Sequence, residues 1–371
     1  MKRRKLFLPL LAMSIALIFI YWYGDKSNQP QFNYEPPIAF NPPGYICYKT
    51  PGTIIIDGKL NSEEWDKIPW SADFVDIEGS KRPTPHFQTR VKMAYDSTGI
   101  YFAALMEEPH VWGTITQHDA VIFHDNDFEI FLNPSNDTHN YMEYEVNALG
   151  TVWDLFLTKP YRDGAVVLNN WEFAGMKSAV SIDGTVNNPS DTDSSWSIEV
   201  FIPWKSVYQP MHRAKMPQDG EHIRVNFSRV QWTTSIQHGT YVKIPIKGEE
   251  KIREYNWVWA PTGVIDIHRP EFWGFVQFST AKAGEREDKF FIAPEEEVKW
   301  KLRNLYYRQA TYRKETGKYA KTKTDLQAAD ICTENELKYL NIHTTPSTYE
   351  ITLPLDNQLW HIRQDGLVWR N

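Results

Sequence analysis

The sequence contains few of the residues and motifs on which metal, disulfide or phosphate chemistry depends. Only two of its 371 residues are cysteines, Cys47 and Cys332, and two cysteines alone form neither a zinc site nor a disulfide framework. One long-range disulfide and two free thiols both remain open, and we favour free thiols. Glycine is scattered and never opens a helix after a strand, and no H-E-x-x-H, G-x-S-x-G or C-x-x-C motif occurs. The usual signals of nucleotide binding, zinc proteases and serine hydrolases are therefore missing.

The chain also lacks the excess of positive charge that nucleic-acid binding needs. Its net charge is −7, and residues 2–5 contribute four positive charges, so the remainder carries −11. An acidic body has no basic surface with which to displace counterions from a phosphate backbone. The composition is instead rich in aromatic residues, with 15 Trp, 19 Tyr and 19 Phe. That is enough to fill a core and to leave some rings free to stack on a ligand.

The N-terminus predicts contact with a membrane. Four basic residues precede residues 6–23, which carry no charge and end in three aromatic side chains. We expect residues 1–24 to be a signal peptide or an uncleaved membrane anchor, and we favour the anchor because no small-residue cleavage site follows. Both interpretations export the rest of the chain to the periplasm or cell envelope. Residues 25–44 are rich in proline and predict a tether.

Residues 45–280 have the pattern of an all-β domain. Residues 90–95 and 100–106 flank Asp96-Ser97-Thr98-Gly99, which is a hairpin signal. Helix-period patterns are scarce, and polar turns separate the runs. Many short strands of this kind indicate an antiparallel sandwich or barrel, and we expect a mainly β chain with an antiparallel β-sandwich body. The other predicted strands are Asp127–Leu132, Tyr141–Asn147, Val152–Thr158, Ser195–Ile202, Ile223–Trp232 and Trp273–Phe278.

The composition changes near Ala281, and residues 281–371 predict a small C-terminal α+β appendage. Residues 282–325 are rich in Lys, Arg and Glu, with apolar residues at helical spacing, which predicts one long amphipathic helix. Short strands are expected at 349–353, 360–363 and 367–369.

Alternation along the predicted strands places a row of polar side chains on one face of a sheet. Side chains two residues apart share a face, so the apolar positions of each strand turn inward together. The outer face would then carry Glu129, Glu145, Asn147, Glu199 and Asn226. The plain interpretation is a solvated face without a function. The alternative is a platform for a polar ligand, because carboxylates and amides can bind sugar hydroxyls while aromatic rings stack on the sugar ring.

Motifs spread along residues 45–280 occur in an order that is similar to a known family. The chain resembles the family 9-like carbohydrate-binding modules, which are DOMON-like β-sandwiches. A fainter similarity links Gln309-Ala310-Thr311-Tyr312 to the helix-to-loop junction of pilin-like domains. The motifs of the first resemblance are Ile56-Asp57-Gly58, Glu64-Trp65, Tyr95-Asp96, Asp127-Phe128-Glu129-Ile130-Phe131-Leu132, Tyr144-Glu145-Val146-Asn147, Trp196-Ser197-Ile198-Glu199, Ile202-Pro203-Trp204 and Asn226-Phe227-Ser228.

The resemblance implies which residues would hold a sugar. Sugar-binding members of the family clamp a terminal sugar between two Trp rings and hold its hydroxyls with charged and amide side chains. Carried over by position, Trp259 matches one ring, Glu129 matches the ligand-binding acid, and Asn147 matches a ligand amide.

Two positions depart from the family pattern. Phe123 stands where the second Trp ring is expected, with Trp112 in the loop before it, and Glu145 replaces an expected Arg. The family also carries structural calcium, for which Asp125 and Asp127 supply oxygen ligands, although a cluster of this kind is also typical of a turn. Calcium is the one cofactor that the resemblance leaves open.

Three functions remain in view. The leading one is carbohydrate binding by an exported, membrane-tethered module without catalytic activity, which supports glycan capture or degradation by partner enzymes. The second is a structural or interaction protein of the cell envelope that has lost its sugar site. The third is a haem protein, since some DOMON-like sandwiches bind haem through Met together with His or Lys. The candidate ligands are Met93, Met106, Met142, His110, His118, His124 and His139. A glycosidase would need two carboxylates on either side of one glycosidic bond, and the sequence does not show whether any two carboxylates lie so.

Overall fold

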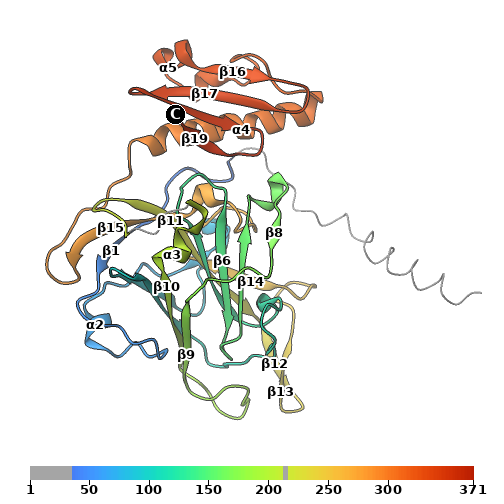
Figure 1. Cartoon of the computed structure of the whole chain (residues 1–371). Helices are drawn as coiled ribbons and strands as arrows, with labels where there is room; N and C mark the ends of the chain where they lie inside the picture. The colour runs from blue at the N-terminus through green and yellow to red at the C-terminus, as the bar shows by residue number, and fades with distance from the viewer. Residues whose placement is uncertain (1–35, 212–215) are drawn as a thin grey trace, which may run out of the picture. The chain divides into compact units, whose positions relative to one another are not determined.

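The computed structural model describes residues 36–211 and 216–371, in which 13 strands form one large mixed β-sheet (Figure 1). Its order is β8-β7-β6-β5-β11-β15-β1-β3-β4-β10-β9, and β14 pairs with both β11 and β2. The strands are β1 (Gly44–Lys49), β2 (Val75–Asp76), β3 (Thr89–Tyr95), β4 (Gly99–Glu107), β5 (Asp127–Asn133), β6 (Tyr141–Asn147), β7 (Val152–Leu157), β8 (Val167–Leu168), β9 (Lys177–Asp183), β10 (Ser195–Pro203), β11 (His222–Trp232), β14 (Glu254–Val258) and β15 (Gly274–Lys282).

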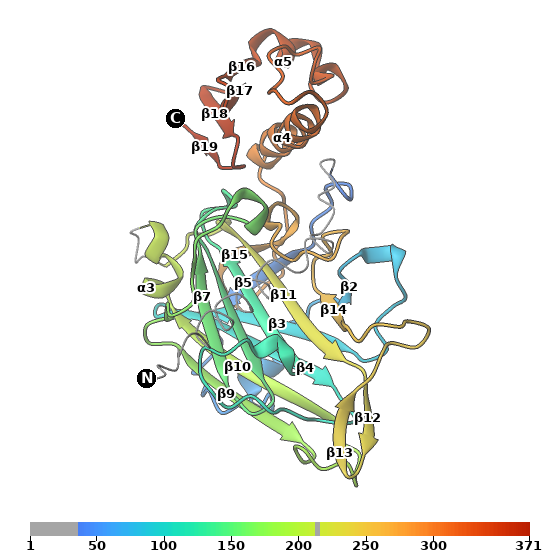
Figure 2. The same cartoon turned by 90° about the vertical axis from the view of Figure 1, so that its right-hand side faces the viewer.

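The two halves of this sheet face each other and enclose one core, which makes the body a sandwich (Figure 2). The predicted alternation is confirmed: Phe128, Ile130 and Leu132 of β5 point into the core, with matching apolar residues from β6, β10 and β11. The predicted hairpin also forms, since Asp96 accepts hydrogen bonds from the backbone N–H groups of Thr98 and Gly99 between β3 and β4.

The prediction of a purely antiparallel sandwich is wrong at β1. This strand lies between β15 and β3 and runs parallel to both, so it joins the two halves of the sandwich. Parallel neighbours need a long connection. Residues 50–88 supply one between β1 and β3, and they contain only short elements: α2 (Glu63–Asp66), β2 and the 3₁₀ turn η2 (Gly79–Lys81).

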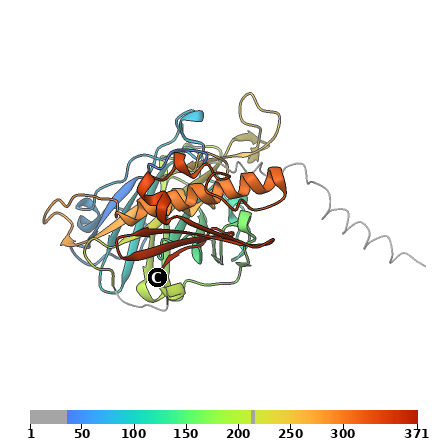
Figure 3. The ribbon, with the colours of Figure 1, turned by 90° about the horizontal axis from the view of Figure 1, so that it is seen from above.

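A second core lies in the C-terminal part, where helix α4 (Glu295–Thr316) packs on a four-stranded antiparallel sheet (Figure 3). The sheet order is β16-β17-β18-β19, with β16 (Asn341–Thr344), β17 (Tyr349–Leu355), β18 (Gln358–Arg363) and β19 (Val368–Arg370). The remaining elements are η3 (Ile122–His124), η4 (Tyr161–Asp163), α3 (Trp204–Val207), η5 (Gln209–Met211), β12 (Thr234–Gln237), β13 (Thr240–Lys243), η6 (Pro270–Phe272), η7 (Ala328–Asp330) and α5 (Glu334–Tyr339).

The predicted helix over 282–325 is shorter than expected. It begins after Pro294 with three glutamates in its first turn, which suit the positive end of the helix dipole. It ends at Gly317, whose φ of 74° gives the left-handed cap that glycine adopts most easily. Of the predicted range, Lys282 ends β15, and residues 284–294 and 318–325 lie in loops and turns. The domain boundaries at 280 and 281 stay a prediction.

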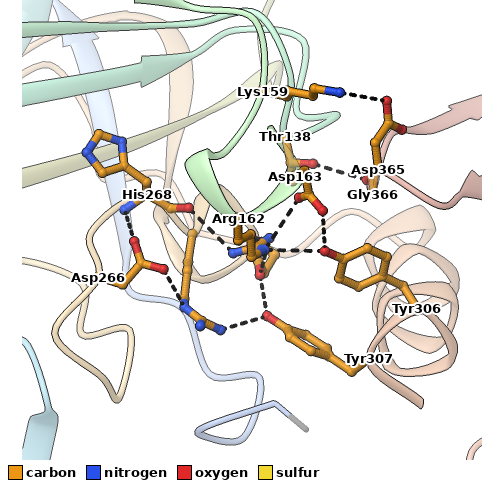
Figure 4. A network of polar contacts seen from close by, with 12 residues as sticks. Thr138, Lys159, Arg162, Asp163, Asp266, His268, Tyr306, Tyr307, Asp365 and Gly366 are labelled. Atoms are coloured by element: carbon orange, nitrogen blue, oxygen red, sulfur yellow. Dashed lines mark hydrogen bonds and ion pairs between the residues drawn. The ribbon is translucent and has the colours of Figure 1, made fainter. Parts of the chain in front are cut away.

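Contacts between the C-terminal part and the sandwich form a polar network (Figure 4). Arg303 of α4 donates to the Thr138 hydroxyl and to the Gly366 carbonyl. Arg162 of η4 lies 2.8 Å from the Glu271 carboxylate, which also accepts from the Tyr307 hydroxyl. These contacts lie near the turn from β5 to β6, at the ends of the strands away from residues 127 and 147.

The N-terminal predictions fall mostly outside the described residues. The predicted membrane segment 1–24 lies there entirely, and within residues 36–211 and 216–371 no helix is long and apolar enough to cross a membrane. Residues 36–43 of the predicted tether contact the folded body. The Phe40 ring stacks on Trp300 with centroids 5.0 Å apart, and the Pro43 carbonyl accepts from the backbone N–H of Phe275.

Candidate functional site

Four carboxylates lie together on the outer face of β5 and β6. We call Asp127, Glu129, Glu143 and Glu145 the acidic cluster. Antiparallel register pairs Glu129 directly with Glu145, so their side chains share a face. Carboxylate oxygens of Asp127, Glu129 and Glu145 lie within 4.8 Å of one another. The strand pattern alone therefore concentrates negative charge at one place.

The acidic cluster is buried rather than solvated. The exposed fractions of its residues run from 0% at Asp127 to 6% at Glu129. Burial raises the pKa of Glu129 to about 7, although a hydrogen bond with Ser228 opposes the rise. Burial and the charge of Glu129 also raise the pKa values of Asp127, Glu143 and Glu145 well above the usual range. Near neutral pH the cluster therefore holds protons that exposed carboxylates would have lost.

Some oxygens of the acidic cluster have no internal partner. Asp127 Oδ1 accepts from the backbone N–H of Val230 at 3.3 Å, and Glu145 Oε2 accepts from that of Phe123 at 3.2 Å. Asp127 Oδ2 and Glu143 Oε2 are buried without a hydrogen-bond partner among residues 36–211 and 216–371. Buried polar atoms are almost always satisfied, so these oxygens need a donor that the described residues do not supply. Because the cluster is at most 6% exposed, an external donor reaches them only if the covering side chains move.

Aromatic rings lie beside the acidic cluster. Phe123 is 36% exposed, and its backbone N–H reaches Glu145. Its carbonyl accepts from Trp232 Nε1 at 2.9 Å, and Lys243 Nζ lies 3.5 Å from the centroid of the Trp232 ring. Trp153 of β7 is paired with Glu145 in register and is also partly exposed. Sequence reasoning did not name Trp232, Trp153 or Glu143 as site residues. Alternation along β6 places Glu143 beside Glu145, register places Trp153 there, and the hydrogen bond to the Phe123 carbonyl places Trp232 there.

The structure corrects the role predicted for Trp259. Its side chain is 5% exposed and lies in the sandwich core, with its ring 5.9 Å from that of Phe227. Gly274 accommodates it, because a Cβ at that glycine would lie 2.3 Å from the indole. Trp257 of β14 and Trp259 just after it both turn inward, so no face of Trp259 is open to a ligand.

Trp112 is also buried, with 5% of its surface exposed. Lys243 Nζ, the amine that lies over Trp232, is 5.8 Å from the centroid of the Trp112 ring. Of the three rings predicted to hold a sugar, Phe123 alone is exposed.

Asn147 lies opposite Asp127 on the same face, and its side chain and that of Asp125 are engaged in holding a loop. Asn147 Nδ2 donates to the Ile115 carbonyl and to Asp125 Oδ2, and its Oδ1 accepts from two backbone N–H groups. Asp125 also accepts from the backbone N–H groups of Thr114 and Ile115 and from the Thr114 hydroxyl. Three of these hydrogen bonds end on Asp125 Oδ2 and one on Oδ1, so most of the acceptor capacity of this carboxylate is already used. The calcium site on Asp125 and Asp127 stays a prediction.

Of the predicted polar row, Glu129, Glu145, Asn147 and Asn226 share one face of the sheet, and Glu199 lies elsewhere. Glu199 lies on β10, in the other half of the sandwich, where it accepts from the backbone N–H groups of Asp57 and Gly58 and from Trp65 Nε1. Asn226 holds Ala260 through both its amide atoms. Both residues fix loops, but Asn226 lies on the same face as Glu129, because β11 pairs Ser228 with Glu129 and Asn226 with Phe131.

The methionines considered as haem ligands are packed in the sandwich core. Met93, Met106 and Met142 are each 0% exposed and belong to its hydrophobic cluster. Their sulfur atoms serve packing, which is the common role of a core methionine.

Comparisons with known proteins give one family. A family model described as "Carbohydrate family 9 binding domain-like" matches residues 56–227. No curated protein matches the chain. A putative carbohydrate-binding protein from Bacteroides uniformis ATCC 8492 is similar at 17% identity and a TM-score of 0.47, over 64% of this chain and 100% of that one.

Two solved structures of a family 9 carbohydrate-binding module from Caldicellulosiruptor kristjanssonii are also similar. The complex with cellotriose has 12% identity and a TM-score of 0.40, and the complex with glucose has 13% identity and a TM-score of 0.41. Each match covers 67% of this chain and 100% of the other.

Proposed function

Because residues 56–227 form a CBM9-like carbohydrate-binding domain, we propose that the chain binds a carbohydrate through the acidic cluster and the exposed rings beside it. The observation that carries the proposal is the pair of buried, unpartnered oxygens, Asp127 Oδ2 and Glu143 Oε2, in a cluster next to Phe123. Sugar hydroxyls are donors that can satisfy such oxygens.

The protonation of the acidic cluster suits a hydroxyl-rich ligand. A sugar hydroxyl both donates and accepts hydrogen bonds. With the pKa of Glu129 at about 7, the cluster contains both ionised carboxylates, which accept, and protonated ones, which also donate. The same face can therefore pair with hydroxyls in either role.

Phe123 and Trp232 are the rings that we expect to stack on the sugar. Phe123 is exposed and Trp232 is partly exposed, and a hydrogen bond joins Trp232 to the Phe123 carbonyl. Aromatic rings supply large apolar area at little cost in conformational entropy. They take the place of the buried Trp259 and Trp112 in the proposal. We expect weak binding to a sugar end or short glycan.

Calorimetric titration of the full chain with a panel of sugars tests the proposal. Glucose and cellotriose come first, because they occupy the similar modules from C. kristjanssonii. Phe123→Ala and Trp232→Ala should each weaken binding about tenfold, which corresponds to about 1.4 kcal/mol of stacking. Tyr339→Ala removes a more exposed ring, from α5, and should leave the affinity unchanged. If both ring variants bind as wild type does, the proposed platform is in the wrong place.

We assign the domain no catalytic role. Hydrolysis of a glycosidic bond needs two carboxylates on either side of it. Glu129 and Glu145 are paired on one sheet face, so both would approach a sugar from the same side. Incubation of the purified chain with oligosaccharides should release no shorter products, and cleavage that disappears in Glu129→Gln would refute this assignment.

We further propose that the domain is exported, tethered to a membrane and used to capture glycans for degradation by partner enzymes. The support is the uncharged run 6–23 behind four basic residues. Protease treatment of intact cells should degrade the protein only after the outer layers are made permeable, and the protein should sediment with membranes. Recovery of the whole protein in the cytoplasm would contradict export.

A second candidate is an interaction protein of the cell envelope that keeps the sandwich without sugar binding. The burial of Trp112 and Trp259 favours it, because the two indoles that the family pattern suggests are occupied by packing. The sugar panel separates the candidates: this one predicts no binding of any glycan.

A further inference from the structure

A second polar cluster lies at β7, away from the acidic cluster. We call His118, Asp119, Asp154 and Glu172 the β7 cluster. One potential ligand atom from each lies within 4.8 Å of the corresponding atoms of the other three. Asp154 follows Trp153 on an alternating strand, so it points to the opposite face of the sheet from Trp153 and Glu145.

Asp154 is the most deeply buried residue of the β7 cluster. Its side chain is 0% exposed. The backbone N–H of Phe173 donates to its Oδ2 at 2.6 Å, which fixes the orientation of the carboxylate. Its Oδ1 is buried and has no hydrogen-bond partner in the described part of the chain. One oriented and one unused oxygen on a buried carboxylate is the arrangement of a ligand supported by a second-shell hydrogen bond.

The other three residues place their potential metal-ligand atoms next to this carboxylate, on its solvent side. His118 Nε2 lies 2.9 Å from Glu172 Oε1 and 3.4 Å from Asp119 Oδ1. The side chains of His118 and Glu172 are 53% and 56% exposed, so an ion can enter from solvent. Asp119 has a φ of 61°, a left-handed conformation that non-glycine residues rarely adopt, and its N–H donates to the Val152 carbonyl.

We propose that the β7 cluster binds a divalent transition metal of the zinc class. One imidazole nitrogen and three carboxylate oxygens give four donors, which is the number and type that tetrahedral zinc accepts. Calcium takes six to eight oxygen ligands and no imidazole, so it fits this set poorly. The imidazole that now bridges two carboxylates would lose its proton and bind the ion through Nε2.

The ion would join three segments that are distant in sequence. His118 and Asp119 belong to the loop before η3, Asp154 to β7, and Glu172 to the segment after β8. Metal binding to a folded chain adds its free energy to folding. We therefore expect the metal to raise the thermal midpoint of unfolding and to hold the loop that carries Phe123. The site does not depend on whether the chain binds sugar.

Titration of the untagged full chain with ZnCl₂, after removal of metals by a chelator, tests the site. Calorimetry should show one zinc ion per chain, and Co²⁺ in its place should give the visible absorption bands of a four-coordinate site. His118→Gln and Asp154→Asn should each weaken zinc binding more than about tenfold, since even second-shell changes cost that much. His343→Gln changes an exposed histidine of the C-terminal sheet and should bind zinc as wild type does.

Three results would overturn the site. Zinc that does not bind at micromolar concentrations removes it directly. Zinc binding that is unchanged in His118→Gln and Asp154→Asn is adventitious binding elsewhere. Calcium that displaces zinc at equal concentration would show a site without the imidazole. If Asp154→Asn does not fold, His118→Gln decides alone, because its side chain is exposed and its loss should not affect folding.

Discussion

Replacement of Glu129 by glutamine should stabilise the chain above neutral pH. Burial raises the pKa of Glu129 from 4.5 to about 7 in the folded chain. A carboxyl group with a raised pKa in the folded state holds its proton more tightly there, so stability is full below pH 4.5 and is lost as the pH rises through 7. At 1.36 kcal/mol for each pKa unit, the loss is about 3 kcal/mol at pH 8.

Glutamine keeps the shape of Glu129 and does not ionise. The gain in Glu129→Gln should therefore be about 3 kcal/mol at pH 8 and close to zero at pH 4.5. It should, if anything, be larger, because the charge of Glu129 also raises the pKa values of Asp127, Glu143 and Glu145. Removing that charge lowers the cost of ionising its neighbours.

Urea unfolding of wild type and variant at the two pH values measures the difference. Glu287→Gln is the matched control, because Glu287 is exposed and its replacement should change the free energy of unfolding by less than about 0.5 kcal/mol at either pH. A variant that is less stable than wild type at pH 8, or that gains equally at both pH values, would refute the reasoning. The first result would mean that the ionised Glu129 is stabilised in place.

Three further substitutions test other parts of the structure. Glu199→Ala should cost about 2–4 kcal/mol in urea unfolding, because it leaves two backbone N–H groups and the Trp65 indole without their acceptor; a loss below about 1 kcal/mol would show that they find others. Arg162→Met should cost about 3–5 kcal/mol at pH 7, because it removes the ion pair of the buried Glu271 carboxylate and leaves it the hydrogen bond from the Tyr307 hydroxyl. Burial raises the pKa of Glu271, but Arg162 and other guanidinium groups lower it to about 2. The stabilisation is therefore present above pH 4.5 and lost towards pH 2, so the free energies of unfolding of wild type and Arg162→Met should become equal near pH 2. A difference that stays constant with pH would exclude this ion pair as the cause. Trp259→Ala should cost about 3–5 kcal/mol as a core cavity and leave any sugar binding measurable at low temperature; lost binding with unchanged stability would restore the exposed ring predicted from sequence.

The alternation of the strands could be predicted from sequence, and it positioned part of the site. Phe128, Ile130 and Leu132 repeat every second residue, which is a local signal, and this fixed the outward direction of Glu129. The same reasoning placed Glu145 on the shared face. Alternation does not predict how deeply the face is buried, because burial depends on what covers the strand. The face whose plain interpretation is a solvated surface therefore carries a buried acidic cluster with raised pKa values.

The register between strands carries the part of the site that the sequence does not reveal. Trp153 lies opposite Glu145 only because β6 and β7 pair as they do, and no spacing in the sequence encodes this. Trp259 follows the short strand β14, which the sequence pattern does not predict. Without that strand there is no alternation from which to infer that the Trp259 side chain points into the core. The β7 cluster brings Asp154 together with residues from two loops, which form no recognisable motif.

The most direct test of carbohydrate binding by the acidic cluster is a pair of calorimetric titrations of the full chain at pH 7, one with wild type and one with Glu129→Gln. The ligand is the sugar that gives the strongest signal in the panel. We predict that Glu129→Gln, although at least as stable as wild type, binds this sugar about tenfold more weakly, through the loss of one charge-assisted hydrogen bond. Equal affinity of the two proteins for the sugar would contradict the account.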